Sequence, residues 1–259
     1  MATWNIINTI DQGGFGIVHE VKSTTGQRGA LKELKSLHPS NVIRFQREIN
    51  ILQNFNHNNI IKIYDSNING SPPRVLSFYV MEFMAGGSLK TKMFHMFNVQ
   101  KSLFAQKWTL GTVILPVVDA IEYAHSKGTF HRDLKPANLL FTTPQHDHIK
   151  VADWGIGKDV NQTSIALTVG GIGTPGYCSP EQWFAVSAID GRTDIYSLGV
   201  VFYEMMTGNL PQVYNNAGQS FSIPAPSSQN HSSISTQLDN SILKMMAYDA
   251  RITVPNVHF

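Results

Sequence analysis

Cysteine, charge and long hydrophobic runs are all scarce in this sequence of 259 residues. Its one cysteine, Cys178, excludes an internal disulfide framework and any CxxC metal site, which is typical of a reducing compartment. Apolar stretches such as residues 113–120 are too short to cross a membrane, and residues 1–10 lack the basic region and apolar core of a secretory signal. We therefore expect a cytoplasmic protein without a membrane span.

Charge of one sign is also lacking, since 20 Lys and Arg stand against 18 Asp and Glu, a formal net charge of +2. This balance gives no reason to expect a nucleic-acid partner. With 42% hydrophobic and 15% charged residues, the chain has enough apolar material for a core and is too apolar and too weakly charged to be disordered throughout. Its length predicts one large domain or two small lobes that share a cleft.

The first hundred residues alternate short β-like runs with turn signals, and one helix interrupts them. The helix is expected near residues 41–55, where Phe45, Ile49 and Leu52 recur at helical spacing and Ser40 or Asn41 is a candidate cap. Glu48 is expected off the apolar face of this helix. The predicted strands are residues 6–10, 17–22, 29–34, 60–64 and 74–83.

Beyond the small residues 85–87, which we interpret as a hinge, the chain becomes mainly helical. Helical spacing marks residues 110–125, 197–206 and 238–246, and a long surface loop is expected over residues 211–237. Pro116 should kink the first of these helices or mark its true start, because proline removes a backbone donor.

Two short motifs carry the strongest chemical signal. Residues 131–138 read HRDLKPAN, and DWG begins fifteen positions after Asn138, at Asp153. In this order and spacing, the sequence resembles the eukaryotic-like (Hanks-type) serine/threonine protein kinases, whose loops read HRDxxxxN and DFG. The resemblance implies that Asp133 orients the substrate hydroxyl, that Lys135 neutralises the transferring phosphate, and that Asn138 and Asp153 hold the metal. Taken alone, Asp133 could be a solvated turn carboxylate.

The same resemblance implies the fold. We expect an α+β, bilobal, protein-kinase-like architecture with an antiparallel sheet plus one helix in the N-lobe and a mainly helical C-lobe. The whole chain, residues 1–259, would be one kinase domain. Its N-lobe would cover about residues 1–84, its hinge about 82–88 and its C-lobe about 88–259, with Mg-ATP held between the lobes.

Residues 10–18, IDQGGFGIV, resemble the glycine-rich GxGxxGxV loop of this family, with Asp11 in place of the first glycine. As a lone motif these glycines would more often form an ordinary hairpin. The sequence Ala-Leu-Lys at residues 30–32, sixteen positions after Gly16, matches the family's AxK strand and favours the nucleotide interpretation. The residues expected to contact the nucleotide here are Ile10, Gly13, Gly14, Phe15, Gly16 and Val18.

By the same resemblance, Lys32 reaches the α- and β-phosphates of ATP and pairs with Glu48. The alternative partner of Glu48 is Arg44, one turn earlier on the helix.

An adenine pocket is implied by residues 79–89, YVMEFMAGGSL. Met81 would stand at the back of this pocket, and the backbones of Glu82 and Met84 would bind the edge of the base. The residues expected on the two faces of the ring are Val18, Ala30 and Leu140. Without the resemblance, these residues would be interpreted as plain core packing.

Residues 156–178 match the family's activation segment, and the wording GTPGYCSPE at residues 173–181 is reminiscent of bacterial kinases. A phosphate on this segment could pair with Arg132, so autophosphorylation is expected at Thr163, Ser164 or Thr168. Thr174 is expected to place its hydroxyl near Asp133 and Lys135. Two further residues have implied structural roles: Asp194 would anchor the catalytic-loop backbone, and Glu181 would pair with Arg251.

These features predict an ATP-dependent Ser/Thr protein kinase with protein substrates and ATP and Mg²⁺ as cofactors, Mn²⁺ being a second candidate. Two alternatives remain open. A pseudokinase acting as a nucleotide-binding scaffold is suggested by Asp11, by Trp154 in place of Phe, and by the short C-terminal part. A small-molecule kinase of similar fold is the third interpretation.

Overall fold

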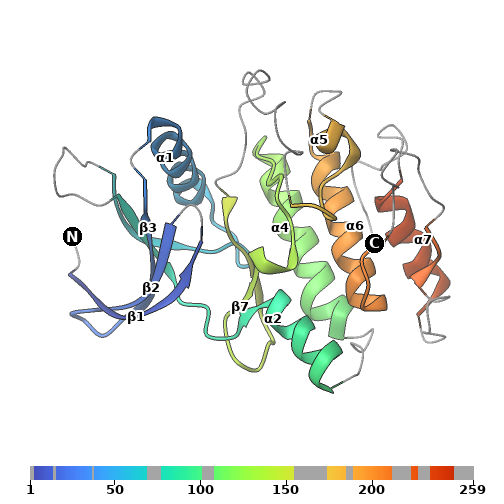
Figure 1. Ribbon diagram of the computed structural model, residues 1–259, viewed down its shortest axis with the longest axis horizontal. Helices are drawn as coiled ribbons and strands as arrows, with labels where there is room; N and C mark the ends of the chain where they lie inside the picture. The colour runs from blue at the N-terminus through green and yellow to red at the C-terminus, as the bar shows by residue number, and fades with distance from the viewer. Residues whose placement is uncertain are drawn as a thin grey trace. The chain divides into compact units, whose positions relative to one another are not determined.

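The structure is a computed structural model of the chain. It describes residues 3–13, 16–36, 38–68, 77–100, 108–154, 174–184, 189–211, 223–226 and 234–247. The chain forms two compact units, which we call unit 1 and unit 2 (Figure 1). Unit 1 contains Met1–Gly87 together with Leu140–Ile156, and unit 2 contains Ser88–Leu139 and Gly157–Phe259. The boundary at Gly87 follows the small-residue stretch that the sequence marks as a hinge.

Unit 1 is built on a five-stranded antiparallel sheet with the order β1-β2-β3-β5-β4. Its strands are β1 (Trp4–Gln12), β2 (Gly16–Ser23), β3 (Arg28–Leu34), β4 (Ile63–Asn67) and β5 (Phe78–Glu82). The first three confirm the predicted strands. The last two are shorter or later than predicted, because apolar runs do not by themselves show where strand pairing begins.

Strand register divides the side chains of this sheet between two faces. Lys32 of β3 pairs with Val18 of β2 and with Tyr79 of β5, and residues directly opposite one another lie on the same face. The other face carries a hydrophobic cluster of Val21, Leu31 and Val80, against which Trp4 and Phe78 pack. The face with Lys32 is therefore the one that the nucleotide prediction concerns.

Helix α1 (Pro39–Asn54) buries Phe45, Ile49 and Leu52, as its periodicity predicts. Two expectations about this helix are wrong. It begins at Pro39, whose fixed φ and missing N–H suit the first helical turn, so Ser40 and Asn41 lie within the helix and do not cap it. Glu48 is buried on the apolar side of the helix because polar partners on the strands satisfy its carboxylate.

A second sheet has the order β6-β7-β8, formed by β6 (Gly87–Ser88), β7 (Leu139–Phe141) and β8 (Ile149–Val151). In unit 1, Val151 of β8 forms a parallel β-bridge with Ile60, which lies between α1 and β4. The Asn59 side chain donates a buried hydrogen bond of 2.8 Å to the Ile149 carbonyl. These bonds position the residues that follow β8, including Asp153.

Unit 2 is mainly helical in its described residues. Its helical elements are α2 (Leu89–Phe94), η1 (His95–Gln100), η2 (Thr109–Ile114), α4 (Leu115–Ser126), η3 (Pro136–Asn138), α5 (Pro180–Phe184), α6 (Arg192–Thr207) and α7 (Thr236–Met245). The predicted boundary at Pro116 is confirmed: the π-helical η2 precedes it, and α4 begins at Leu115 with the proline in its first turn. None of the described helices is long and apolar enough to cross a membrane.

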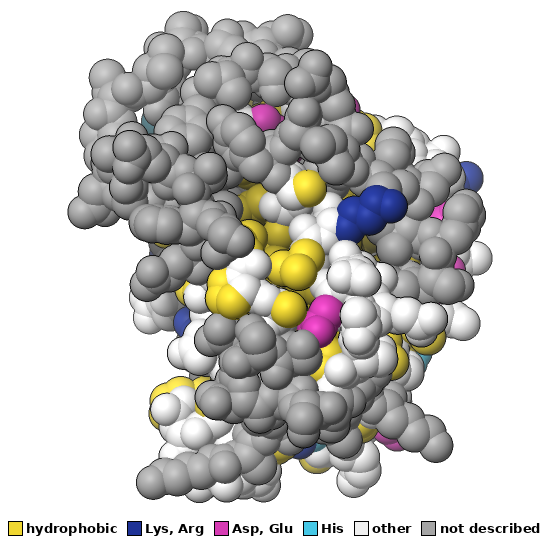
Figure 2. All heavy atoms as spheres, turned by 90° about the vertical axis from the view of Figure 1, so that its right-hand side faces the viewer, with side chains coloured by type: hydrophobic (Ala, Val, Ile, Leu, Met, Phe, Trp, Pro, Cys, Tyr) yellow, Lys and Arg dark blue, Asp and Glu magenta, His cyan; other side chains and the backbone are white. Residues whose placement is uncertain are grey.

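Helix α6 forms the centre of this unit. All of its residues except Arg192 and Glu204 are buried, and it ends at Gly208 in the left-handed conformation. Helix α7 packs against it at Gly199, where an added Cβ would meet the Met246 side chain at 2.7 Å. On the face of the unit that includes α7, the described hydrophobic side chains gather in a small group (Figure 2). The buried α6 also carries Asp194, which reaches the HRD loop.

Candidate active site

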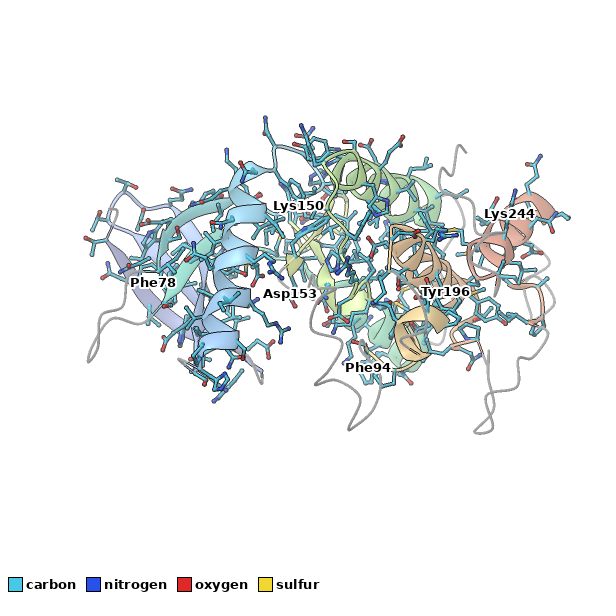
Figure 3. The ribbon with its side chains drawn as sticks, turned by 90° about the horizontal axis from the view of Figure 1, so that it is seen from above. Phe78, Phe94, Lys150, Asp153, Tyr196 and Lys244 are labelled. Atoms are coloured by element: carbon cyan, nitrogen blue, oxygen red, sulfur yellow. The ribbon has the colours of Figure 1, made fainter. Side chains whose placement is uncertain are left out.

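The predicted phosphate anchor lies in unit 1, where four side chains form what we call the Lys32 cluster: Lys32, Glu48, Tyr79 and Asp153. The Lys32 ammonium donates to both Glu48 carboxylate oxygens, at 2.9 and 3.0 Å, and to Asp153 Oδ1 at 2.6 Å. Asp153 lies beside α1 in Figure 3, in agreement with these contacts. The predicted ion pair between Lys32 and Glu48 is thus formed.

Tyr79 is a member of this cluster that the sequence did not single out. Its hydroxyl donates to Glu48 Oε1 at 2.7 Å, and the Lys32 Nζ lies 5.7 Å from the centre of its ring. A tyrosine in a strand ordinarily indicates packing, so the signal would have been its register opposite Lys32. Register cannot be read from one strand alone.

Burial and charge set the protonation of the cluster. Burial alone lowers the pKa of Lys32, but the carboxylates of Glu48 and Asp153 raise it well above its ordinary value, so the ammonium persists. Burial raises the pKa of Glu48, while Lys32 and the Tyr79 hydroxyl act in the opposite direction. Burial and the charge of Glu48 also raise the pKa of Tyr79 well above its ordinary value. Tyr79 therefore stays protonated and acts as a donor.

The predicted nucleotide contacts of unit 1 lie on the five-stranded sheet, in the segment after β5 and in β7. Lys32, Val18, Ala30 and Met81 share one face of the sheet, as the pairings of Val18 with Lys32 and of Ala30 with Met81 show. Leu140 lies half-buried in β7. The backbone N–H of Glu82 donates to the Lys62 carbonyl at 3.0 Å. Met84 follows β5 and is half-buried.

The described residues of the glycine-rich segment belong to β1 and β2, which pair antiparallel, and to Gly13, which follows β1. Ile10 is about half exposed on β1, and the N–H of Gly13 donates to the Gly16 carbonyl at 3.1 Å. Gly16 also has a structural reason to be glycine, since an added Cβ would meet the Glu33 carbonyl oxygen at 2.5 Å. The Asp11 carboxylate accepts the Gln12 N–H at 2.8 Å. Gly14 and Phe15 lie outside the described residues.

Unit 2 contains a second group, the Asp133 cluster: Asp133, Lys135, Asn138 and Thr174. The Lys135 ammonium donates to Asp133 Oδ2 and to Thr174 Oγ1, both at 2.8 Å, and the Thr174 hydroxyl donates to Asp133 Oδ1 at 2.9 Å. The prediction that Thr174 lies near Asp133 and Lys135 is confirmed. Both carboxylate oxygens of Asp133 are therefore held in a defined direction.

Asn138 braces the backbone of the same loop. Its Nδ2 donates to the Asp133 carbonyl at 2.9 Å, with a longer contact of 3.5 Å to Asp133 Oδ2. Within the part of the chain that the structure describes, its amide oxygen accepts no hydrogen bond. Asp153 in unit 1 keeps a carboxylate about one-third exposed. Amide and carboxylate oxygens are the ligands that Mg²⁺ prefers, so the chemistry of both residues fits this metal.

The HRD backbone is held by Asp194 of α6, which is fully buried. Its carboxylate accepts the N–H groups of His131 at 2.8 Å and Arg132 at 2.7 Å, and it also lies 2.8 Å from His125 Nε2. These bonds hold Arg132 at a φ of 65°, in the left-handed region that non-glycine residues rarely adopt. The predicted anchoring role of Asp194 is confirmed.

Trp154, which replaces the expected Phe, is fully buried in unit 1. Its indole N–H donates to the Val151 carbonyl at 3.2 Å, and its ring meets Phe55 edge-on at 5.0 Å between centroids. The larger ring therefore has both a polar and an apolar partner. Several predicted residues lie outside the described part of the chain: Gly155, Thr163, Ser164, Thr168 and Arg251.

The protein kinase domain family matches residues 4–257 of this chain. This chain belongs to the protein kinase family. Three curated relatives of this kinase domain are bacterial: Pkn1 of Myxococcus xanthus, PknB of Mycobacterium leprae and a probable serine/threonine-protein kinase, CA_C1728, of Clostridium acetobutylicum. They are 32%, 32% and 34% identical over 95%, 91% and 80% of this chain.

The kinase domain spans only part of these relatives. It covers 35%, 38% and 30% of their lengths, about a third of each. The comparisons thus confirm the predicted family and the predicted bilobal class of fold. The cytoplasmic location stays a prediction.

Proposed function

We propose that this kinase domain transfers the γ-phosphoryl group of Mg-ATP to serine or threonine hydroxyls of protein substrates. The observation that carries the proposal is the Asp133 cluster, in which a nearly buried carboxylate is fixed by Lys135 and Thr174. Catalysis of phosphoryl transfer depends mainly on positioning of the reacting groups and on stabilisation of the charge on the phosphoryl group, and this arrangement is suited to both. The names of the relatives, all serine/threonine kinases, support the choice of acceptor.

Four side chains have proposed roles in this reaction: Asp133, Lys135, Asn138 and Asp153. Asp133 accepts a hydrogen bond from the acceptor hydroxyl and so orients its oxygen for attack. Lys135, already 2.8 Å from Asp133, places a positive charge where negative charge develops on the transferring group. Asn138 and Asp153 would hold Mg²⁺, which supplies charge neutralisation at the phosphate oxygens when bound.

Lys32 is proposed to bind the α- and β-phosphates. All three of its N–H donors are occupied in the structure, two by Glu48 and one by Asp153. A phosphate oxygen that contacts Lys32 must therefore replace or share the donor now used by Asp153, while Glu48 keeps the ammonium in place. Val18, Ala30, Met81 and Leu140 are proposed to contact the adenine ring, and the backbones of Glu82 and Met84 its edge.

The test is transfer of radiolabelled γ-phosphate to the chain itself and to a basic protein substrate. Wild type should transfer phosphate, and Asp133→Asn and Lys32→Met should each lower the rate by at least about a hundredfold, because each removes a positioned charge. Asp147→Asn, in an exposed turn of unit 1, is the matched control and should keep the wild-type rate. A wild-type chain that binds Mg-ATP without any transfer would favour the scaffold alternative.

Autophosphorylation at Thr163, Ser164 or Thr168 is part of the same proposal. A phosphate there would add charge that Arg132 can pair with bidentately. Intact-mass measurement after incubation with Mg-ATP should show added phosphate in wild type and none in Asp133→Asn. An active wild type whose mass does not change would contradict this part alone.

A further inference from the structure

Glu48 can align Lys32 only if something aligns Glu48. Its side chain is 4% exposed, so its orientation is set by the protein and not by water. Both of its oxygens contact the same ammonium, which requires the carboxylate plane to face Lys32 squarely. The bond from Lys32 alone does not fix this plane, because the carboxylate can rotate and keep a single contact.

A second donor approaches Glu48 from a different strand. The Tyr79 hydroxyl donates to Glu48 Oε1 at 2.7 Å, the same oxygen that accepts from Lys32 at 2.9 Å. Two donors on one oxygen and one on the other leave a single orientation of the carboxylate. Because Tyr79 lies in β5 and Lys32 in β3, the two donors are fixed by the sheet register.

The ring of Tyr79 is itself held. It is 1% exposed, and Phe45 of α1 packs on it at 5.2 Å between ring centroids. A tyrosine so fixed loses little entropy when it donates, so its hydroxyl acts as a rigid guide for Glu48. The pKa of Tyr79 is raised by burial and by the charge of Glu48, so the donor proton is retained throughout the neutral range.

We infer that Tyr79 is a positioning residue for phosphate binding: its hydroxyl holds Glu48 in the orientation that directs Lys32 toward the nucleotide. The inference rests on the proposed function, since it deepens the role given there to Lys32. A purely structural role would differ, because loss of the hydroxyl would then affect the stability of unit 1 but not the affinity for ATP in particular.

The test uses Tyr79→Phe, which removes one oxygen and keeps the ring packed on Phe45. The affinity of the chain for Mg-ATP is measured by calorimetry, and KM for ATP, KM for the protein substrate and kcat are measured where transfer is detected. We expect the dissociation constant and KM for ATP to rise about tenfold, the value of one lost hydrogen bond to a charged group, with KM for the protein substrate unchanged. Thermal unfolding should confirm that Tyr79→Phe is folded.

Two comparisons show whether the hydroxyl acts through Glu48. Tyr64→Phe is the matched control, because Tyr64 of β4 stacks on Trp4 in the same unit, away from the cluster, and it should bind Mg-ATP as wild type does. In a Glu48→Gln background, adding Tyr79→Phe should cause no further loss of affinity for Mg-ATP, because the Tyr79 hydroxyl acts on Lys32 only through the Glu48 carboxylate.

Equal losses from Tyr79→Phe in both backgrounds, or no loss in either, would overturn the inference. The proposed function fails separately: a wild type that binds Mg-ATP but transfers nothing refutes it, and the affinities of the variants still decide the role of Tyr79. A wild type that does not bind Mg-ATP overturns both.

Discussion

Cys178, the one thiol of the chain, lies four residues after Thr174, which contacts Asp133. Burial raises the pKa of Cys178 to about 11, and the nearby charges of Asp133 and Glu181 act in the same direction. At pH 8 about 0.1% of this thiol is ionised, against about a quarter of an ordinary one, and the thiolate is the reactive form. We therefore predict that Cys178 in the native protein reacts with iodoacetamide at least a hundredfold more slowly than in the unfolded chain.

The measurement is intact mass after timed alkylation at pH 8, with and without denaturant. The native rate should climb as the pH approaches 11, since a raised pKa moves ionisation to higher pH. Equal native and unfolded rates at pH 8 would show that the thiol is not shielded.

How far the sequence predicts single residues depends on which partners are visible in it. The pairing of Lys32 with Glu48 and the contact of Thr174 with Asp133 follow from motifs, and both are present in the structure. Tyr79 was missed because its role comes from cross-strand register, which the local sequence does not contain. Glu48 was placed on the wrong side of its helix because an analysis by periodicity assigns every carboxylate to the solvent-facing side. In the structure, hydrogen bonds from Lys32 and Tyr79 offset the cost of burying this carboxylate.

At the scale of elements, α6 supports the HRD loop through one buried carboxylate. Asp194→Asn keeps the shape but presents a single accepting oxygen to the N–H groups of His131 and Arg132. One buried donor is then left unpaired or faces another donor, so we predict a loss of about 2–4 kcal/mol in the free energy of unfolding. Phosphotransfer should fall as well, because the left-handed backbone at Arg132 loses its support.

Denaturant unfolding and the phosphotransfer assay measure the two effects on the same preparation. The control is Asp147→Asn in unit 1, an exposed position where the asparagine keeps an oxygen to accept the Thr143 hydroxyl, so the unfolding midpoint should change little. Wild-type stability in Asp194→Asn would mean that the two backbone donors find other partners.

The segment at the end of unit 1 depends on a close backbone approach. Gly86 donates its N–H to the Phe141 carbonyl at 3.0 Å, and a Cβ at this position would meet the Phe141 Cβ at 2.6 Å and also the Thr143 carbonyl oxygen. We predict that Gly86→Ala destabilises the protein by about 1–3 kcal/mol, the usual cost of overpacking. A Cβ on Gly111 would have no atom within 4 Å, so Gly111→Ala should be neutral or slightly stabilising. Denaturant midpoints that fall equally for both variants would contradict this account.

The elements themselves were predicted where local signals suffice. Helical periodicity located α1, α6 and α7, and Pro116 marked the start of α4. The start of α1 was missed by one or two residues, because Pro39 begins the helix where side-chain capping by Ser40 or Asn41 was expected. The π-helical turn of η2 was not foreseen, since the i to i+5 bond that Leu115 makes to Leu110 leaves no sequence periodicity in so short a segment.

At the scale of the whole molecule, Mg-ATP should stabilise the native chain, because a ligand that binds only the folded state shifts the unfolding equilibrium. At a hundred times the dissociation constant the gain is about 2.7 kcal/mol. For a chain of 259 residues each kcal/mol raises Tm by about 2–4 °C, so we predict a rise of about 5–10 °C. Lys32→Met should lose most of this rise, and Lys62→Met, an exposed lysine in the same unit, should keep it.

The rise in Tm with Mg-ATP is also measured for Asp133→Asn. Asp133 is proposed to orient the acceptor hydroxyl and not to hold the nucleotide, so its variant should keep the full rise in Tm while it loses phosphotransfer. Binding and chemistry then depend on different residues, Lys32 in unit 1 and Asp133 in unit 2. If Asp133→Asn lost the thermal rise together with transfer, the carboxylate would be needed to bind Mg-ATP, and this division of roles between Lys32 and Asp133 would be wrong.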